Sequence, residues 1–207
     1  MWSVRVHYNV ALTDGGKMKG FILGIIVTLL VLVIGAYIYF GTGMAPVATS
    51  AQAMPFEKTL ANMALHARVR KEMPKQVPIQ ADEANLQGGA KVYMDECAVC
   101  HGLPGQPQSD IGLGEFPKPP HLFKGKGVTD DPPGETYWKV ANGIRLTGMP
   151  AFQNHLSATQ MWQVSLLVAN ADKLPPSVSG ILNTPPQPAA EPAPGIGNKP
   201  NQAAPKK

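Results

Sequence analysis

The sequence predicts an all-α protein in which one membrane-spanning helix precedes a small helical domain. Three observations support this fold class. Residues 20–40 form an uncharged apolar run, residues 56–73 repeat apolar side chains at spacings of three and four, and the residues around Cys97 read as helix and loops. Most of the 21 prolines lie after Cys100 and in the tail. We therefore expect a compact core of about 90 residues, a size at which a covalent or metal staple is common.

The first element is a transmembrane helix at residues 20–41. About 20 apolar residues cross a hydrocarbon core of about 30 Å, because an α-helix rises about 1.5 Å per residue. Lys17 and Lys19 precede the run, and Tyr37 and Tyr39 near its far end suit a membrane interface. The positive-inside rule then keeps residues 1–19 in the cytoplasm. We expect a single-pass protein of the inner membrane whose domain lies in the periplasm.

Two alternatives concern the N-terminus. Ala51-Gln52-Ala53 resembles a signal-peptide processing site, although the apolar run is long for a signal sequence and Ala53 lies far beyond it. Met18-Lys19 followed by the apolar run would itself make a normal beginning, so Met18 is an alternative start.

Residues 42–83 form a linker that contains one predicted helix, at about 56–73. Its apolar face consists of Phe56, Leu60, Met63, Ala64 and Ala67. Such a helix either packs on the following domain or lies at the membrane surface, where Arg68, Arg70 and Lys71 could meet anionic lipid.

The chain ends in a tail at residues 177–207 that we expect to be disordered. Seven prolines and almost no large apolar side chain follow Thr184, so this segment cannot bury enough surface to fold. Between Asp82 and Lys173 there are ten acidic and seven basic residues. Because that region lacks a basic stripe with interleaved aromatics, we exclude a nucleic-acid partner.

The chemistry of the domain is indicated by Cys97, Cys100 and His101. These are the only two cysteines, and a histidine follows the second one directly. Cysteines three residues apart on a helix lie on one side, where each can form a thioether with a vinyl group of one porphyrin, and the histidine can then ligate the iron. The pattern predicts one covalently bound haem c.

Two other uses of these cysteines fit the sequence less well. A thioredoxin-type dithiol needs a strand–helix setting, and a zinc site needs a second pair of cysteines or histidines at a matching distance. Neither is present around Cys97.

We expect Met149 to be the second axial ligand of the iron. Gly148 allows the backbone to approach the macrocycle, Pro150 stiffens the loop, and a thioether is a soft donor that favours reduced iron. Met94, on the cysteine helix, and Met161, on the last helix, are weaker candidates. His121 and His155 are the bis-histidine alternatives.

These residues resemble the class I cytochromes c, and in particular the small haem-c domains that serve respiratory complexes. Gly89, Tyr93 and Cys97 are similar to the family's first helix, in which the glycine allows the last helix to cross closely. Residues 157–173 are similar to that last helix, with Trp162 and Leu166 or Leu167 as its contact. The resemblance implies a haem domain at residues 84–176. It also implies that the Pro120 carbonyl accepts a hydrogen bond from His101 Nδ1, since Pro120-His121-Leu122 matches the family's Pro-x-Leu turn.

Two further residues are candidates for contact with the haem. Arg145, in a segment similar to the one before the family's methionine loop, could pair with a propionate or be an ordinary surface arginine. Trp138 could pack on the haem edge or fill the core.

Lys118, Lys124 and Lys126 could surround the exposed haem edge and steer a partner.

With both axial positions filled, the predicted function is electron transfer and not catalysis on a small-molecule substrate. The expected partners are redox proteins in or at the membrane, of a respiratory or photosynthetic system. Two alternatives are the haem subunit of a larger membrane oxidase or dehydrogenase, and a sensor or peroxidase in which Met149 dissociates.

Overall fold

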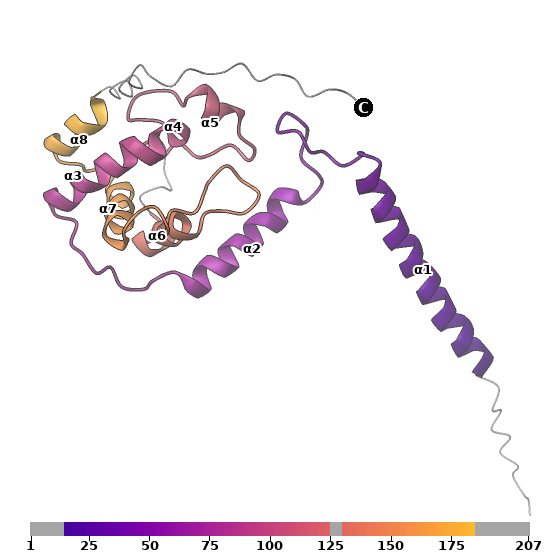
Figure 1. The fold of residues 1–207 in the computed structure, drawn as a ribbon. Coiled ribbons are helices and arrows are strands. Elements are labelled where there is room, and N and C mark those ends of the chain that lie inside the picture. The colour runs from indigo at the N-terminus through magenta and orange to yellow at the C-terminus, as the bar shows by residue number, and fades with distance from the viewer. Residues whose placement is uncertain (1–14, 125–129, 185–207) are drawn as a thin grey trace, which may run out of the picture. The chain divides into compact units, whose positions relative to one another are not determined.

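Helices make up all the regular secondary structure in the part of the chain that this computed structural model describes, residues 15–124 and 130–184 (Figure 1). The chain divides into two units, residues 1–55 and residues 56–207. Because their relative placement is not determined, each unit is described by itself. The all-α prediction is confirmed over the described residues.

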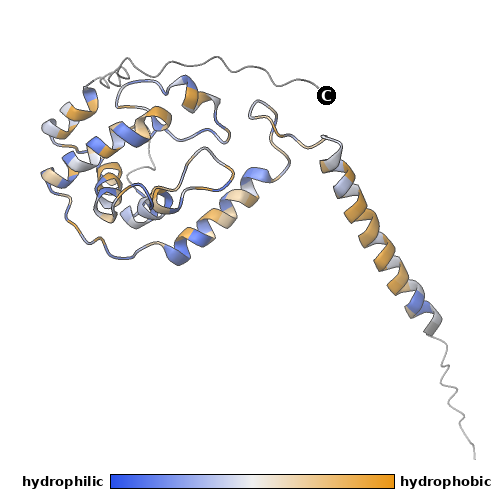
Figure 2. Ribbon diagram, viewed as in Figure 1, coloured by the Kyte–Doolittle hydropathy of each residue, from blue (hydrophilic) through white to orange (hydrophobic). Residues whose placement is uncertain are grey.

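The first unit contains helix α1 (Gly15–Gly41), which is apolar along most of its length (Figure 2). Thr28 Oγ1 in α1 donates to the Gly24 carbonyl over 2.9 Å, and Thr42 Oγ1, just after the helix, donates to the Ile38 carbonyl over 2.7 Å. Both threonine hydroxyl groups thus bond to the helix backbone, which suits a bilayer. By length and composition α1 can cross a membrane, a test that signal sequences also pass.

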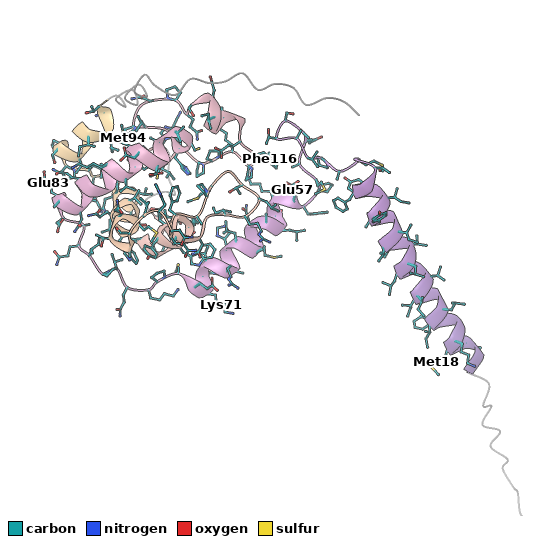
Figure 3. All side chains as sticks on the ribbon, viewed as in Figure 1. Met18, Glu57, Lys71, Glu83, Met94 and Phe116 are labelled. Carbon is teal, nitrogen blue, oxygen red and sulfur yellow. The ribbon has the colours of Figure 1, made fainter. Side chains whose placement is uncertain are left out.

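The second unit begins with α2 (Glu57–Glu72), close to the predicted range, and Glu57 and Lys71 mark its two ends in Figure 3. The helix packs on α6 (Pro133–Asn142). The side chains that turn towards the domain are not those of the predicted apolar face. Val69 is completely buried, whereas Phe56, Leu60 and Met63 are exposed. Which face of α2 is buried depends on α6, more than 60 residues further along the chain. The local periodicity of α2 therefore did not identify the buried face.

The centre of the domain is the crossing of α3 (Glu83–Val92) and α7 (Ala158–Ala169). Gly89 lies at the crossing, where a Cβ atom would be 2.3 Å from the Gln163 carbonyl oxygen and 3.1 Å from Leu167 Cβ. This confirms the predicted close approach at Gly89 and the role of Leu167. Trp162 stacks on Tyr137 of α6, with ring centroids 4.2 Å apart.

A helical segment of three parts carries the cysteines. Helix α3 continues into the π-helical turn η1 (Tyr93–Cys97), and this turn leads into α4 (Ala98–His101). Tyr93 is completely buried, donates a hydrogen bond of 2.7 Å to the Gly102 carbonyl and packs edge-on against Phe123. Short helix α5 (Asp110–Gly114) then packs on α4. π-helical turns are frequent at functional sites, because they reorient the side chains that follow.

Helix α8 (Pro176–Asn183) departs from the predicted organisation, in which residues 177–207 were a tail. Val178 and Leu182 are completely buried, and α8 packs on α3. Pro176 occupies the first helical position, where a proline fits without the loss of a hydrogen bond. The folded unit therefore extends at least to Asn183, and residues 185–207 lie outside the described part.

Candidate haem site

A cavity of about 390 Å³ lies in the second unit and brings together residues that are far apart in the sequence. Cys97, Cys100 and His101 line it from the helical segment, and Met149 lines it from the loop that follows α6. Apolar side chains form much of the remaining wall, namely Leu122, Val140, Ile144, Phe152, Val164 and Val168. The residues predicted to anchor a haem and to ligate its iron therefore share one apolar cavity, of a size usual for cofactor sites.

The orientation of His101 is set by its contact with the loop that contains Pro120. Its Nδ1 lies 2.8 Å from the Pro120 carbonyl oxygen. Because a carbonyl oxygen can only accept, the hydrogen is on Nδ1, and Nε2 keeps a lone pair that can bind a metal. Burial lowers the pKa of His101, which also favours the neutral imidazole that a metal requires.

Three residues that sequence reasoning missed, Gln108, Ser109 and Gly112, join the segment before Pro120 to α4, and Gln108 also holds the Pro120 loop. Gln108 Nε2 donates to the carbonyl oxygens of Cys100 and Pro119, over 2.9 Å each. Ser109 Oγ bonds to the Val99 carbonyl, and the absence of a side chain at Gly112 allows its backbone to approach Cys100. No motif marked these residues, because their partners are main-chain atoms of a distant segment.

The two cysteine thiols, as they stand before any thioether forms, are not of the reactive kind. Burial, with smaller contributions from Glu96 and Cys100, raises the pKa of Cys97 to about 12. Burial and a hydrogen bond of 2.8 Å to Glu115 Oε1 raise the pKa of Cys100 to about 11. A redox-active dithiol needs the opposite shift. Within the described residues, no cluster of histidine, cysteine and carboxylate side chains could hold a metal ion, so a zinc site lacks ligands.

The loop that carries Met149 is closed by its own hydrogen bonds. Thr147 Oγ1 donates to the Ile144 carbonyl over 2.7 Å and accepts from the Met149 amide over 3.1 Å, while the Ile144 amide donates to the Met149 carbonyl over 3.2 Å. The Glu115 carboxylate lies against Gly148, where a Cβ atom would be 2.1 Å from Glu115 Oε2. The thioether of Met149 is thus presented to the cavity by a tight and well-bonded turn.

The other candidate ligands lie elsewhere. Met94, labelled in Figure 3, packs against the core without lining the cavity, and Met161 is buried in α7. His121 uses both ring nitrogens on backbone groups, with Nε2 2.9 Å from the Gln106 carbonyl oxygen and Nδ1 3.2 Å from the Phe123 amide. His155 Nε2 lies 2.9 Å from Glu96 Oε1, outside the cavity wall.

The structure places the two predicted haem contacts away from the cavity. Arg145 is exposed and does not line it. Trp138 faces α2, where its Nε1 donates to Glu72 Oε2 over 3.2 Å, so it neither lines the cavity nor joins the buried core. Of the three lysines expected at the haem edge, Lys118 lines the cavity, Lys124 is exposed away from it, and Lys126 lies outside the described residues.

The residues present fit a haem c group. They offer two sulfur atoms three residues apart, an imidazole with a free nitrogen, a thioether on another segment and an apolar enclosure. In a c-type cytochrome two cysteine sulfur atoms hold the haem covalently, and histidine with methionine is the axial pair of the cytochromes c.

One family model matches part of this chain, the part that contains the two cysteines, His101 and Met149. Residues 84–166 match the family model described as cytochrome c oxidase, cbb3-type, subunit III. Among solved structures, the chain is similar to a chain of the reducing HAO-like protein complex of Kuenenia stuttgartiensis, with 26% identity and a TM-score of 0.40. The alignment covers 45% of this chain and 46% of that chain, less than half of each. The comparison with curated proteins gives no match.

Proposed function

Because residues 84–166 form a mono-haem c-type cytochrome domain, which binds one haem c covalently, we propose that this chain is a membrane-anchored electron carrier on the periplasmic side. The observation that carries the proposal is the shared cavity of Cys97, Cys100, His101 and Met149. With His101 and Met149 as the two axial ligands, no coordination position stays open for a substrate. Electron transfer is then the function that the site supports best.

Each residue of the site has a distinct part in holding the cofactor. Cys97 and Cys100 are the only cysteines of the chain, so the thioether bonds must come from them. The Pro120 carbonyl fixes the tautomer of His101, and a hydrogen bond of this kind also makes the imidazole a stronger ligand. Met149 supplies a soft donor that favours ferrous iron. When bound, the haem supplies a one-electron couple between ferric and ferrous iron.

The proposed location depends on α1. A helix that can cross a membrane, followed after a linker by a domain with covalent haem, suits a protein whose N-terminus is held in the inner membrane while its domain lies in the periplasm. The domain would then exchange electrons with redox proteins in or at that membrane, such as those of a respiratory or photosynthetic chain.

A denaturing gel stained for haem tests the proposal. The full-length chain, produced in a host that matures c-type cytochromes, should keep its stain after denaturation. The double variant Cys97→Ser with Cys100→Ser should lose it, whereas the control Met94→Leu should keep it, because Met94 lies outside the cavity wall. A double variant that still stains would overturn the proposed attachment.

One observation favours a second candidate function. The matching family model is described as a subunit of an oxidase, so this chain could be the haem subunit of a larger membrane complex. Gentle solubilisation of the native membrane separates the two possibilities. A carrier migrates alone, and a subunit migrates together with large partner proteins.

A further inference from the structure

Helix α2 supplies part of the cavity wall, although it lies outside the segment that matches the family model. Asn62, Leu65 and His66 all line the cavity. Together with the buried Val69 and with Glu72 they follow spacings of three and four, so they form one face of the helix. The haem domain of this chain therefore contains a wall that residues 84–166 alone do not provide.

Contacts at its C-terminal end hold α2 in this position. Glu72 accepts the hydrogen bond from Trp138 and also pairs with Arg68 at 2.7 Å. Just after the helix, the Pro74 carbonyl approaches Gly134 so closely that a Cβ atom there would be 2.1 Å from the oxygen. Only a glycine permits this approach, so the wall is a fixed part of the domain.

The polar side chains of α2 that line the cavity, those of Asn62 and His66, are exposed and lack a protein partner. Among the residues that the structure describes, neither the Asn62 amide nor the His66 ring makes a side-chain hydrogen bond or ion pair. Two other donors on the wall are occupied, whereas Lys118 and Thr136 have no side-chain hydrogen bond or ion pair within the described residues. Lys139 pairs with Glu135 at 2.7 Å and with Asp131 at 3.6 Å, and Thr147 bonds within its own loop.

The chemistry of haem c indicates what these donors could bind. The periphery of the macrocycle is apolar except for two propionate carboxylates, on the edge remote from the two thioether positions. Helix α2 packs on α6, whereas α4, which carries Cys100 and His101, packs on α5, so the two form different walls. Glu115, bonded to Cys100, makes the cysteine side unfavourable for a carboxylate.

We infer, on the basis of the proposed haem site, that Asn62 and His66 bind a haem propionate. The amide and the imidazole each offer an N–H donor, and hydrogen bonds to an ionised carboxylate are among the stronger ones. These two residues would take the role that the sequence suggested for Arg145. Leu65 between them would shield the adjacent ring edge from water.

Redox-difference infrared spectroscopy of the full-length, haem-loaded chain tests this inference. Haem made from aminolevulinic acid with a heavy isotope at its carboxyl carbon separates the propionate bands from those of Asp and Glu. The variants are Asn62→Leu and His66→Leu, which remove the donors, and His66→Gln, which keeps one. Met63→Gln is the control, because Met63 is on the same helix and is exposed like Asn62 and His66, but does not line the cavity.

The donor-removing variants should shift the propionate bands and lower the reduction potential, since a less compensated carboxylate charge stabilises ferric iron. His66→Gln should stay closer to the wild type, and Met63→Gln should match it. Lys118 lines the cavity from another segment and is the alternative donor to the propionate, so Lys118→Met tests that alternative. Bands that move with Lys118→Met alone, or with none of the variants, would overturn the inference. A wild-type chain that shows no haem stain would instead count against the proposed function.

Discussion

The Nδ1 atom of His101 and the carbonyl oxygen of Pro120 lie 2.8 Å apart, although the two residues are on different segments of the domain. Gln108 makes this contact possible, because its side-chain amide ties Cys100 and Pro119 together through their carbonyl oxygens. The position of His101, the proposed ligand, is thus set largely by main-chain carbonyl groups and by one glutamine that binds two of them.

The first prediction concerns Gln108. Gln108→Leu should lower the free energy of unfolding of the haem-loaded chain by about 1–3 kcal/mol, because two hydrogen bonds are lost and two partly buried carbonyl groups lose a partner. Urea unfolding followed by absorbance measures it. Gln106→Leu is the matched control, since the side chain of Gln106 is exposed. Equal stability of the two variants would mean that the loop is held by other contacts.

The second prediction concerns Met149. Met149→Leu should keep the covalent haem, lose the weak methionine–iron band at the red edge of the ferric spectrum and lower the reduction potential, because the soft ligand is gone. Met94→Leu and Met161→Leu should both retain the band, since neither side chain lines the cavity. If the band survives in Met149→Leu, the ligand is another residue.

The third prediction concerns the crossing of α3 and α7. Gly89→Ala should destabilise the domain by about 1–3 kcal/mol, because the added Cβ meets the Gln163 backbone and the helices must separate. Gly88→Ala should cost less, since its Cβ meets only the end of the flexible Gln163 side chain. Gly180→Ala, where nothing lies within 4 Å, should be neutral or stabilising. Denaturant midpoints would rank the three, and any other order would contradict the geometry.

The sequence was most informative where a pattern depends on neighbours in the chain. Three patterns could be recognised from nearby residues alone. They are the apolar run of α1, the spacing of Cys97, Cys100 and His101, and the glycine at position 89. The structure bears out the helices and the close approach that these patterns predicted.

The sequence was less informative where burial is decided by distant segments. Helix α2 has apolar side chains on two faces, and only its contact with α6 determines that Val69 is buried and Leu60 exposed. The prolines after Thr184 suggested a tail that starts at residue 177, yet Pro176 begins a helix whose Val178 and Leu182 complete the core. Trp138 was expected at the haem or in the core, whereas its hydrogen bond to Glu72 joins α6 to α2.

The last prediction concerns the membrane anchor and the freedom of the domain. Extraction of membranes with alkaline carbonate should leave the stained protein in the pellet, because α1 is long and apolar enough to span the bilayer. A chain that begins after Ala53 should be found in the supernatant. If the full-length protein is released at that shorter size, α1 acts as a signal sequence and not as an anchor.

The chain between α1 and α2 then sets how far the haem domain can reach. Because α2 packs on the domain, only residues 42–56 are left as a tether, with a root-mean-square reach of about 20 Å if flexible. Deleting residues 45–50 should slow electron delivery to a membrane partner without changing the haem spectrum, since a shorter tether samples fewer positions. Replacing the same six residues by Gly and Ser is the control, and it should preserve the rate. An unchanged rate after the deletion would mean that the domain stays docked on its partner, as expected for a subunit of a larger complex.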